Sequence, residues 1–238
     1  MAVHTFPIES VKQSLLGGDS IQATYRLVRT YLSLHNQSGD TNEDHLNCPD
    51  RAAVVRAITE FGSWSGERPR DEPKLLWVSL HGEEPSHPLH VGVRGLSAAF
   101  STTSLDNHAE LVDWWDVLNG LRGVCPLNVV VIMDVCWGGS PSAPGSLTKR
   151  TGNPKLLFGP IRSAHRLELD TATSFILATL VGGAAPSVAG AKTVVRALNK
   201  IFPRDPETKK EFYRVWWWNA AGTHKCFPPP KPAMTRAT

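Results

Sequence analysis

The chain has 238 residues, of which 41% are hydrophobic and 20% are charged. This composition is ordinary for a folded globular protein and argues against extensive disorder. The formal charge is only +3, and the basic residues are scattered apart from short groups such as Lys149-Arg150 and Lys209-Lys210. Because nucleic-acid binding needs many phosphate contacts, we expect no nucleic-acid partner.

The sequence also favours a cytoplasmic location. Its start lacks the basic segment followed by an apolar segment that marks a secretory signal, and no stretch approaches the ~18 apolar residues of a membrane helix. We therefore expect no membrane partner. The cysteines have no short paired spacing, so a reducing compartment would leave them as thiols. They are Cys48, Cys125, Cys136 and Cys226.

The first predicted elements are a strand and a helix. Residues 24–35 are rich in β-branched and aromatic side chains in partial alternation, which favours a strand. A helix is expected to begin after Asp50, a residue type that caps helices, and to end at Gly62. Its apolar residues recur with a period of 3.6: Val54, Ala57, Ile58 and Phe61.

Two apolar runs predict buried strands in the middle of the chain. Residues 75–80 and 128–133 are almost continuously apolar, as expected for parallel strands covered on both faces. Between them, residues 89–96 alternate in the manner of a small hairpin. A helix is predicted after that hairpin from the spacing of Leu111, Trp114, Trp115, Leu118 and Leu121.

The C-terminal half continues the alternation of elements. Residues 140–154 are predicted to form a loop, and residues 155–158 and 212–218 are predicted to form strands. Two helices lie between these strands. Their apolar positions are Leu169, Ala172, Phe175, Ile176 and Leu180 in the first, and Val188, Ala191, Val194, Val195, Leu198 and Ile201 in the second.

This order of elements predicts an α/β fold. Strands that alternate with helices favour a three-layer α/β/α sandwich around a mostly parallel sheet, here of about six strands. Residues 1–226 are expected to form one domain, because the length suits a single core and no internal repeat is present. The Pro-rich segment 227–238 is expected to be a disordered C-terminal tail.

Two motifs follow the predicted buried strands, at the sheet edge where open α/β folds bind ligands. His81 and Gly82 follow the strand at 75–80, and the segment DVCWGG, which begins at Asp134, follows the strand at 128–133. A cysteine attacks as a thiolate, so it needs a neighbouring imidazole or cation that lowers its pKa. If the two strands are neighbours, His81 and Cys136 emerge side by side as base and nucleophile.

Acyl transfer also needs donors for the developing oxyanion, and the backbone amides of Gly82 and Cys136 are the expected pair. A glycine after His81 lets a substrate carbonyl approach the main chain without a β-carbon in the way. Gly138 and Gly139 would serve the turn behind the nucleophile in the same manner.

These residues resemble a known family. A strand ending in His-Gly (LLWVSLHG), followed by a second ending in Asp-x-Cys-x-Gly-Gly (VVVIMDVCWGG), is similar to the caspase-like (clan CD) cysteine peptidases, and among them to the bacterial CHAT domain family. The segment KLLFGPIRSAHRLELDTATSFILATLVGGAAPSVAG resembles the CHAT pattern of a strand, a Gly-Pro loop and two helices. Together the resemblance spans about residues 24–219. The chain departs from many relatives at Gly138, where they have serine.

The resemblance implies an endopeptidase that cleaves a protein substrate with a Cys136–His81 dyad and without a cofactor or a metal. Asp134 has the position that lines the primary specificity pocket in metacaspase-like relatives. This implies cleavage after Arg or Lys, because a cationic side chain compensates a buried carboxylate. Arg150 is then a candidate self-processing site. Trp137 either packs under the active-site turn or forms one wall of the substrate pocket.

CHAT proteins resemble effectors of bacterial stress and immune systems. A sensor or scaffold protein is therefore the expected partner, in a role such as antiviral defence. The alternative is a catalytically silent CHAT-fold module that signals by binding a partner. Retention of both His81 and Cys136 favours the enzyme, because a scaffold has no need of a paired base and thiol.

Two other interpretations are weaker. His81, His87 and His90 fit no standard zinc spacing, so we expect no metal site. The sequence from Gly190 to Thr193 approaches a phosphate-binding loop but lacks its G-x-x-x-x-G-K-[ST] string, which disfavours nucleotide binding.

Overall fold

The computed structural model describes residues 2–9, 22–35, 37–46, 48–82, 100–101, 111–112, 114–121, 128–139, 154–181, 186–207, 209, 211–219 and 223–229. The predicted hairpin at 89–96, most of the predicted loop at 140–154, and residues 230–238 of the predicted tail lie outside these ranges. Among the described residues, no helix combines the length and apolar character needed to cross a bilayer.

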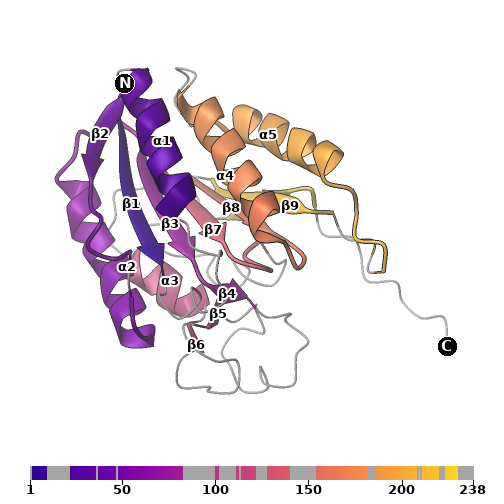
Figure 1. Cartoon of the computed structure of the whole chain (residues 1–238), viewed down its shortest axis with the longest axis horizontal. Coiled ribbons are helices and arrows are strands. Elements are labelled where there is room, and N and C mark those ends of the chain that lie inside the picture. The colour runs from indigo at the N-terminus through magenta and orange to yellow at the C-terminus, as the bar shows by residue number, and fades with distance from the viewer. Residues whose placement is uncertain are drawn as a thin grey trace.

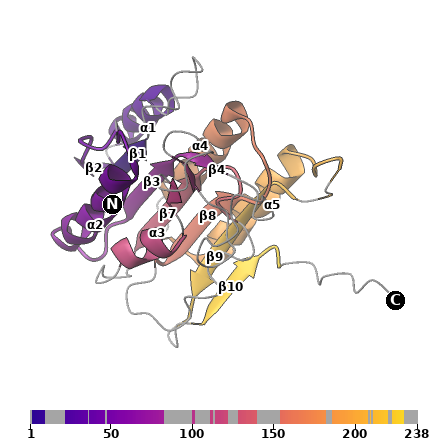
Figure 2. The ribbon, with the colours of Figure 1, turned by 90° about the horizontal axis from the view of Figure 1, so that it is seen from below.

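The centre of the molecule is a seven-stranded sheet. In chain order its strands are β1 (Val3–Glu9), β2 (Ser38–Thr41), β3 (Lys74–Ser79), β7 (Val129–Asp134), β8 (Leu156–Pro160), β9 (Tyr213–Trp218) and β10 (His224–Phe227). Across the sheet the order is β10-β9-β8-β7-β3-β1-β2, which Figure 2 shows from one edge to the other. The five strands from β8 to β2 are parallel, whereas β9 and β10 are antiparallel to their neighbours. The expected mostly parallel sheet is therefore confirmed.

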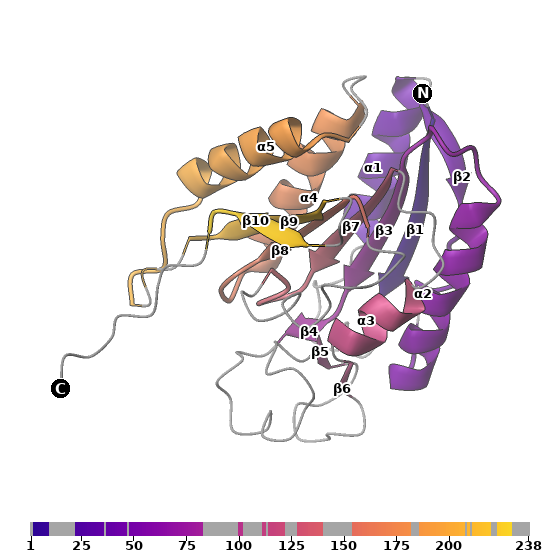
Figure 3. The same cartoon turned by 180° about the vertical axis from the view of Figure 1, so that it is seen from behind.

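Helices cover both faces of this sheet. They are α1 (Gln22–Leu34), α2 (Arg51–Gly66), α3 (Trp114–Gly120), α4 (Arg166–Val181) and α5 (Val188–Ile201). Helices α1, α4 and α5 lie on one face (Figure 1), and α2 and α3 lie on the other, which faces the viewer in Figure 3. The predicted three-layer α/β/α sandwich is confirmed.

The two hydrophobic cores follow from the alternation of side chains along the strands. In β3, Leu76 and Val78 pack in the core beneath α2 and α3, whereas Leu75 and Trp77 pack in the core beneath α1, α4 and α5. Every residue of β3 and β7 is buried, because helices cover both faces of these strands. This double burial explains their continuously apolar sequences.

The helix starts agree with the capping signals of the sequence. The side chain of Asp50 accepts a hydrogen bond from the amide of Ala53 at 2.8 Å and caps α2. This helix continues through Gly62 to Gly66, so its predicted end is wrong. Trp64 is buried in the same core as the rest of the helix, and its contacts favour the additional turn.

The prediction of a strand at residues 24–35 is also wrong, because this segment lies in helix α1. Tyr25, Val28 and Leu32 are buried and recur at helical spacing, while Leu34 is 76% exposed. The helical period of the buried side chains therefore outweighs the β-propensity of the individual residues.

A second, three-stranded sheet continues from the end of β3. It consists of the antiparallel strands β4 (His81–Gly82), β5 (Phe100–Ser101) and β6 (Leu111–Val112). Because residue 111 lies in β6, the helix predicted from its apolar spacing begins only at Trp114. This small sheet places His81 and Gly82 directly beyond the carboxyl end of β3.

Candidate active site

The candidate catalytic residues follow the carboxyl ends of β3 and β7. These strands are parallel neighbours, and Ser79 is the register partner of Asp134. His81 and Cys136 each follow two residues later, so the main chain delivers both residues to the same edge of the sheet. The expectation that the two strands are neighbours is confirmed. The backbone of His81 lies in β4, whereas its side chain lies outside the described part of the structure.

Gly82 packs directly against the backbone of Cys136. A β-carbon at residue 82 would overlap the carbonyl oxygen of Cys136 and would stand 2.8 Å from a methyl carbon of Val135. Only glycine therefore allows β4 to approach this closely. The contact joins the segment that carries the histidine to the turn that carries the cysteine.

A tight turn after β7 presents Cys136. The amide of Gly138 donates a hydrogen bond to the carbonyl of Val135 at 2.9 Å. A β-carbon at residue 138 would stand 2.8 Å from the β-carbon of Met133 and 2.9 Å from the carbonyl oxygen of Val135. The turn of this chain therefore requires glycine at residue 138.

Trp137 supports this turn from beneath. Its φ of 65° lies in the left-handed region, which is uncommon for a residue with a side chain. Its amide donates to the carbonyl of Arg162 at 3.2 Å. The side chain is 8% exposed and belongs to the hydrophobic core that includes Met133 and Val135. Of the two placements considered from the sequence, the indole has the one under the turn.

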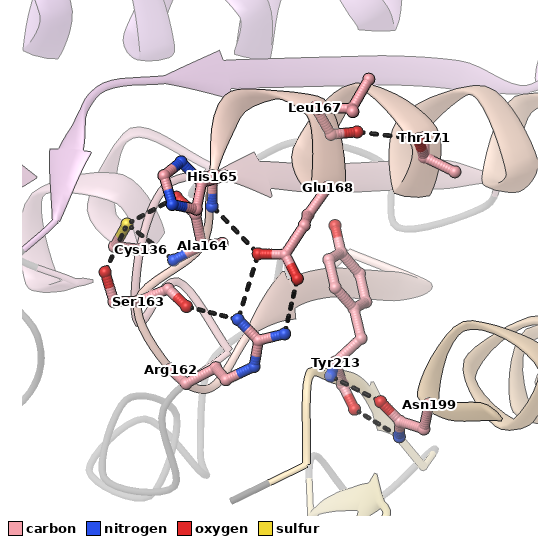
Figure 4. Close-up of polar contacts among 10 residues, drawn as sticks. All are labelled: Cys136, Arg162, Ser163, Ala164, His165, Leu167, Glu168, Thr171, Asn199 and Tyr213. Carbon is pink, nitrogen blue, oxygen red and sulfur yellow. Dashed lines mark hydrogen bonds and ion pairs between the residues drawn. The ribbon is translucent and has the colours of Figure 1, made fainter. Parts of the chain in front are cut away.

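The backbone of Ala164 and the hydroxyl of Ser163 lie against the sulfur of Cys136 (Figure 4). The amide of Ala164 donates to Sγ at 3.3 Å, the thiol can donate to the carbonyl of Ala164 at 3.6 Å, and Oγ of Ser163 lies 3.9 Å from Sγ. Burial raises the pKa of the Cys136 thiol, and the hydrogen bonds of Ala164 and Ser163 offset only part of this effect. The thiol therefore needs a base to become a nucleophile.

A paired arginine and glutamate hold residues 163–164 in place (Figure 4). The guanidinium of Arg162 donates to both carboxylate oxygens of Glu168, at 2.7 and 3.1 Å, and to the carbonyl of Ser163 at 2.7 Å. Glu168 also accepts from the amide of His165 at 3.0 Å, as in a helix N-terminal capping box. Burial raises the pKa of Glu168, but these hydrogen bonds outweigh burial and lower the pKa overall.

Asp134 lies in a buried cluster of charges just before the nucleophile. Its side chain is fully buried, and Oδ2 accepts from Nε1 of Trp77 at 3.0 Å and from Nη2 of Arg166 at 2.7 Å. Arg166 also pairs with Asp170 and contacts Oγ of Ser79 at 3.3 Å. Burial raises the pKa of the Asp134 carboxyl, and the guanidinium of Arg166 opposes this shift. The guanidinium keeps its proton, so the two groups form an ion pair wherever the carboxyl is ionised.

The other cysteines differ in their surroundings. Burial raises the pKa of Cys48 to about 11. Cys226 is half-buried in β10, and burial raises its pKa as well. Cys125 and Arg150 lie outside the described residues. Among the residues that the structure describes, no group of three His, Cys, Asp or Glu side chains is arranged to hold a metal.

The residues that surround the sulfur and the buried carboxylate were not predicted from the sequence. Glu168 at the third helical position was the one local signal for the beginning of α4, because His165 is not a residue type that typically caps helices. The pairing of Arg166 with Asp134 spans 32 positions and depends on where α4 packs, so no local pattern contained it.

No protein-family model and no curated protein sequence matches the chain. One similar solved structure is a secreted C11 cysteine protease from Bacteroides thetaiotaomicron, in complex with an irreversible peptide inhibitor. It is 10% identical with a TM-score of 0.54, and the match covers 91% of this chain and 66% of that chain, just under two thirds of its length. A structural-genomics target from Geobacter sulfurreducens is 14% identical with a TM-score of 0.44, over 97% of this chain and 94% of that chain. The first likeness shows that the chain has the caspase-like α/β fold.

Proposed function

We propose that the chain is a caspase-like cysteine endopeptidase of the CHAT type, with Cys136 as the nucleophile and His81 as the base. The register of β3 and β7 is the observation that carries this proposal, because it brings residues 81 and 136 to one edge at the same level. The close approach of Gly82 to Cys136 supports it independently. The caspase-like fold, which the C11 cysteine protease also has, agrees with this chemistry.

The proposed reaction is the hydrolysis of a peptide bond through an acyl-enzyme. His81 takes the proton of the Cys136 thiol, and the sulfur attacks the substrate carbonyl. The amides of Gly82 and Cys136 donate hydrogen bonds to the resulting oxyanion. The peptide C–N bond then breaks, the imidazolium of His81 protonates the leaving amine, and water hydrolyses the thioester. No cofactor takes part in these steps.

Asp134 is the proposed anchor for the side chain before the scissile bond, the P1 residue. A fully buried carboxylate two residues before the nucleophile would attract Arg or Lys at P1, in competition with Arg166, which pairs with Asp134 in this structure. Trp137 packs under the turn in the core on the opposite face of the sheet, so it would support the position of the nucleophile rather than the P1 side chain. A peptide library in which acidic P1 residues are preferred would contradict this part of the proposal.

The capped thiol suits a protease that is activated by a partner. A sensor or scaffold protein that draws residues 163–164 away from Sγ would expose the nucleophile. We place the chain accordingly among the effectors of bacterial stress or antiviral immune systems. Addition of a candidate sensor protein is expected to accelerate labelling of Cys136, and an unchanged rate would remove that protein as the partner.

The central test is covalent labelling by a peptidyl electrophile that forms a thioether with an active-site cysteine. We expect the wild-type chain to be labelled at Cys136, Cys136→Ala to be inert, and His81→Ala to react slower by a factor of about 10²–10⁴, the usual contribution of a general base. Cys226→Ala is the matched control, since it removes another half-buried thiol. Folded wild-type protein that is never labelled would favour the silent signalling module instead.

A further inference from the structure

Arg166 pairs with Asp134, whose carboxylate the proposed function assigns to the P1 side chain of the substrate. This residue begins α4, and its guanidinium lies 2.7 Å from Oδ2 of Asp134. The Arg166 side chain is only 14% exposed, so it is part of the buried cluster rather than a surface group. A cation supplied by the chain itself therefore lies where a basic substrate residue would be neutralised.

Arg166 meets only part of the hydrogen-bonding capacity of the Asp134 carboxylate. Oδ2 of Asp134 accepts two hydrogen bonds, but Oδ1 is buried and has no hydrogen-bond partner among the described residues. A buried acceptor without a partner is unfavourable, and a donor that reaches it is stabilising. The guanidinium also contacts two acidic side chains, those of Asp134 and Asp170, and is therefore shared between them.

The same short segment covers both groups that a substrate would use. The backbone of Ala164 contacts the sulfur of Cys136, and two residues later the side chain of Arg166 contacts Asp134. A bound substrate would place its scissile carbonyl at the sulfur and its P1 side chain at the carboxylate. Residues 164–166 thus lie at the two places that the scissile carbonyl and the basic P1 side chain of a substrate must reach.

We propose that Arg166 is a specificity-determining residue of this protease, whose guanidinium competes with a basic P1 side chain for Asp134. The proposal rests on the function proposed above. In the wild-type chain a P1 cation gains little, because it must displace Arg166 or share the carboxylate with it. Without the resident cation, the carboxylate selects strongly for Arg or Lys.

The test compares two peptidyl acyloxymethyl ketones that differ only at P1, one with arginine and one with citrulline, its uncharged analogue of the same shape. The measured quantity is the ratio of their second-order rate constants for alkylation of Cys136. Arg166→Met keeps the apolar stem and removes the charge. We expect this change to raise the ratio of the Arg probe to the citrulline probe by about tenfold or more, since a charge-assisted hydrogen bond is involved. The double variant Arg166→Met, Asp134→Asn is expected to return the ratio to about one.

Two further variants separate specificity from folding. Arg166→Lys keeps a cation beside the carboxylate and is expected to keep the wild-type ratio. Arg196→Met removes another arginine by the same change, in helix α5, and is also expected to keep the wild-type ratio. If Arg166→Met does not fold, Asp134→Asn alone decides, because the guanidinium of Arg166 then keeps only Asp170 as its acidic partner and should make the Arg probe slower than the citrulline probe.

The outcomes distinguish the two proposals. A ratio that stays at the wild-type value in folded Arg166→Met, or in Asp134→Asn, would show that Arg166 only anchors α4, and would overturn the inference while the protease assignment stands. Absence of Cys136 labelling by either probe, in wild type and in the variants, would overturn the proposed function and this inference with it.

Discussion

Gly82 and Cys136 lie so close together that a β-carbon at residue 82 would overlap the carbonyl oxygen of Cys136. The contact lies beyond the last register pair of β3 and β7, Ser79 with Asp134, and extends their alignment into the loops. A change at this one position should therefore disturb the cysteine turn without touching the central sheet.

Gly82→Ala is expected to destabilise the chain by about 1–3 kcal/mol, the usual result of forcing an extra carbon into a packed site. Because the nearest obstruction is the backbone carbonyl of Cys136, β4 and the cysteine turn must move apart. We expect labelling of Cys136 by the peptidyl electrophile to fall more steeply than stability, since the amide of residue 82 is a proposed oxyanion donor. Urea unfolding and labelling rates measure the two effects separately.

Gly66→Ala is the matched control for this change. Nothing lies within 4 Å of a β-carbon at residue 66, at the end of α2. Replacement there is expected to leave labelling unchanged and to stabilise the chain by about 0.4–1 kcal/mol, because it restricts the unfolded chain. Equal effects of the two substitutions would contradict the special role of Gly82.

The capped sulfur predicts an unusual pH profile for a small electrophile. Burial raises the pKa of Cys136 above its ordinary value, so the thiol stays protonated at neutral pH in the capped form. The rate of alkylation by iodoacetamide is expected to rise with pH and to continue rising beyond the ordinary cysteine pKa of about 8.5. A plateau below neutral pH would instead indicate a thiolate that is already formed in the resting structure.

The ion pair of Arg162 and Glu168 predicts that the free energy of unfolding decreases at low pH. The pKa of Glu168 is lowered in the folded chain, so its contribution is present above the unfolded pKa of about 4.3 and is lost as the pH falls through the folded value. Glu168→Gln is expected to cost about 1.5–3 kcal/mol at pH 7 and much less near pH 3. Urea unfolding at the two pH values measures this difference.

The same substitution should loosen residues 163–164. Glu168 fixes the guanidinium of Arg162, and this guanidinium in turn donates to the carbonyl of Ser163. We therefore expect iodoacetamide to alkylate Cys136 faster in Glu168→Gln than in wild type. Glu211→Gln is the control, since its partner Arg204 is 57% exposed and exposed ion pairs contribute about 0–1 kcal/mol. If Glu168→Gln behaved like this control, the segment would not depend on the pair.

The position of the site was predictable because it follows from the ends of two apolar strands. Continuous burial of β3 and β7 gave both strands a clear sequence pattern, and His81 and Cys136 follow them directly. The environment of the sulfur was not predictable in this way. Contacts from Ala164 and Arg166 depend on how the start of α4 packs against β7, which no local pattern encodes.

The first part of the fold was the hardest to predict. β1 is central, between β3 and β2, but it contains Pro7, and proline normally argues against a central strand because it cannot donate to the ladder. The segment that becomes α1 has residues of high β-propensity, and exposed Leu27 and Leu34 obscured its helical period. β10 was missed because its four residues are only partly buried and lack an apolar run.

The buried hydroxyl of Tyr213 gives a last prediction, on the side of the sheet that α4 covers. The side chain is fully buried, and its hydroxyl has no hydrogen-bond partner among the described residues. An unpaired buried hydroxyl is unfavourable, so Tyr213→Phe is expected to leave stability unchanged or to raise it by about 1–2 kcal/mol at pH 7. By contrast, Tyr25→Phe should lose about 0.5–1.5 kcal/mol, because that hydroxyl donates to Glu43 at 3.3 Å.

The stability of Tyr213→Phe should also differ from that of wild type in alkaline solution. Burial, and then the charge of Asp134, raise the pKa of Tyr213 well above its ordinary value, so the folded chain keeps this phenol protonated. The unfolded chain releases the proton near pH 10, so wild-type stability falls as the pH rises above that value. Tyr213→Phe should lose less stability between pH 9 and 11 in urea titrations. A variant whose stability falls as steeply as that of wild type would mean that the hydroxyl is hydrated rather than buried.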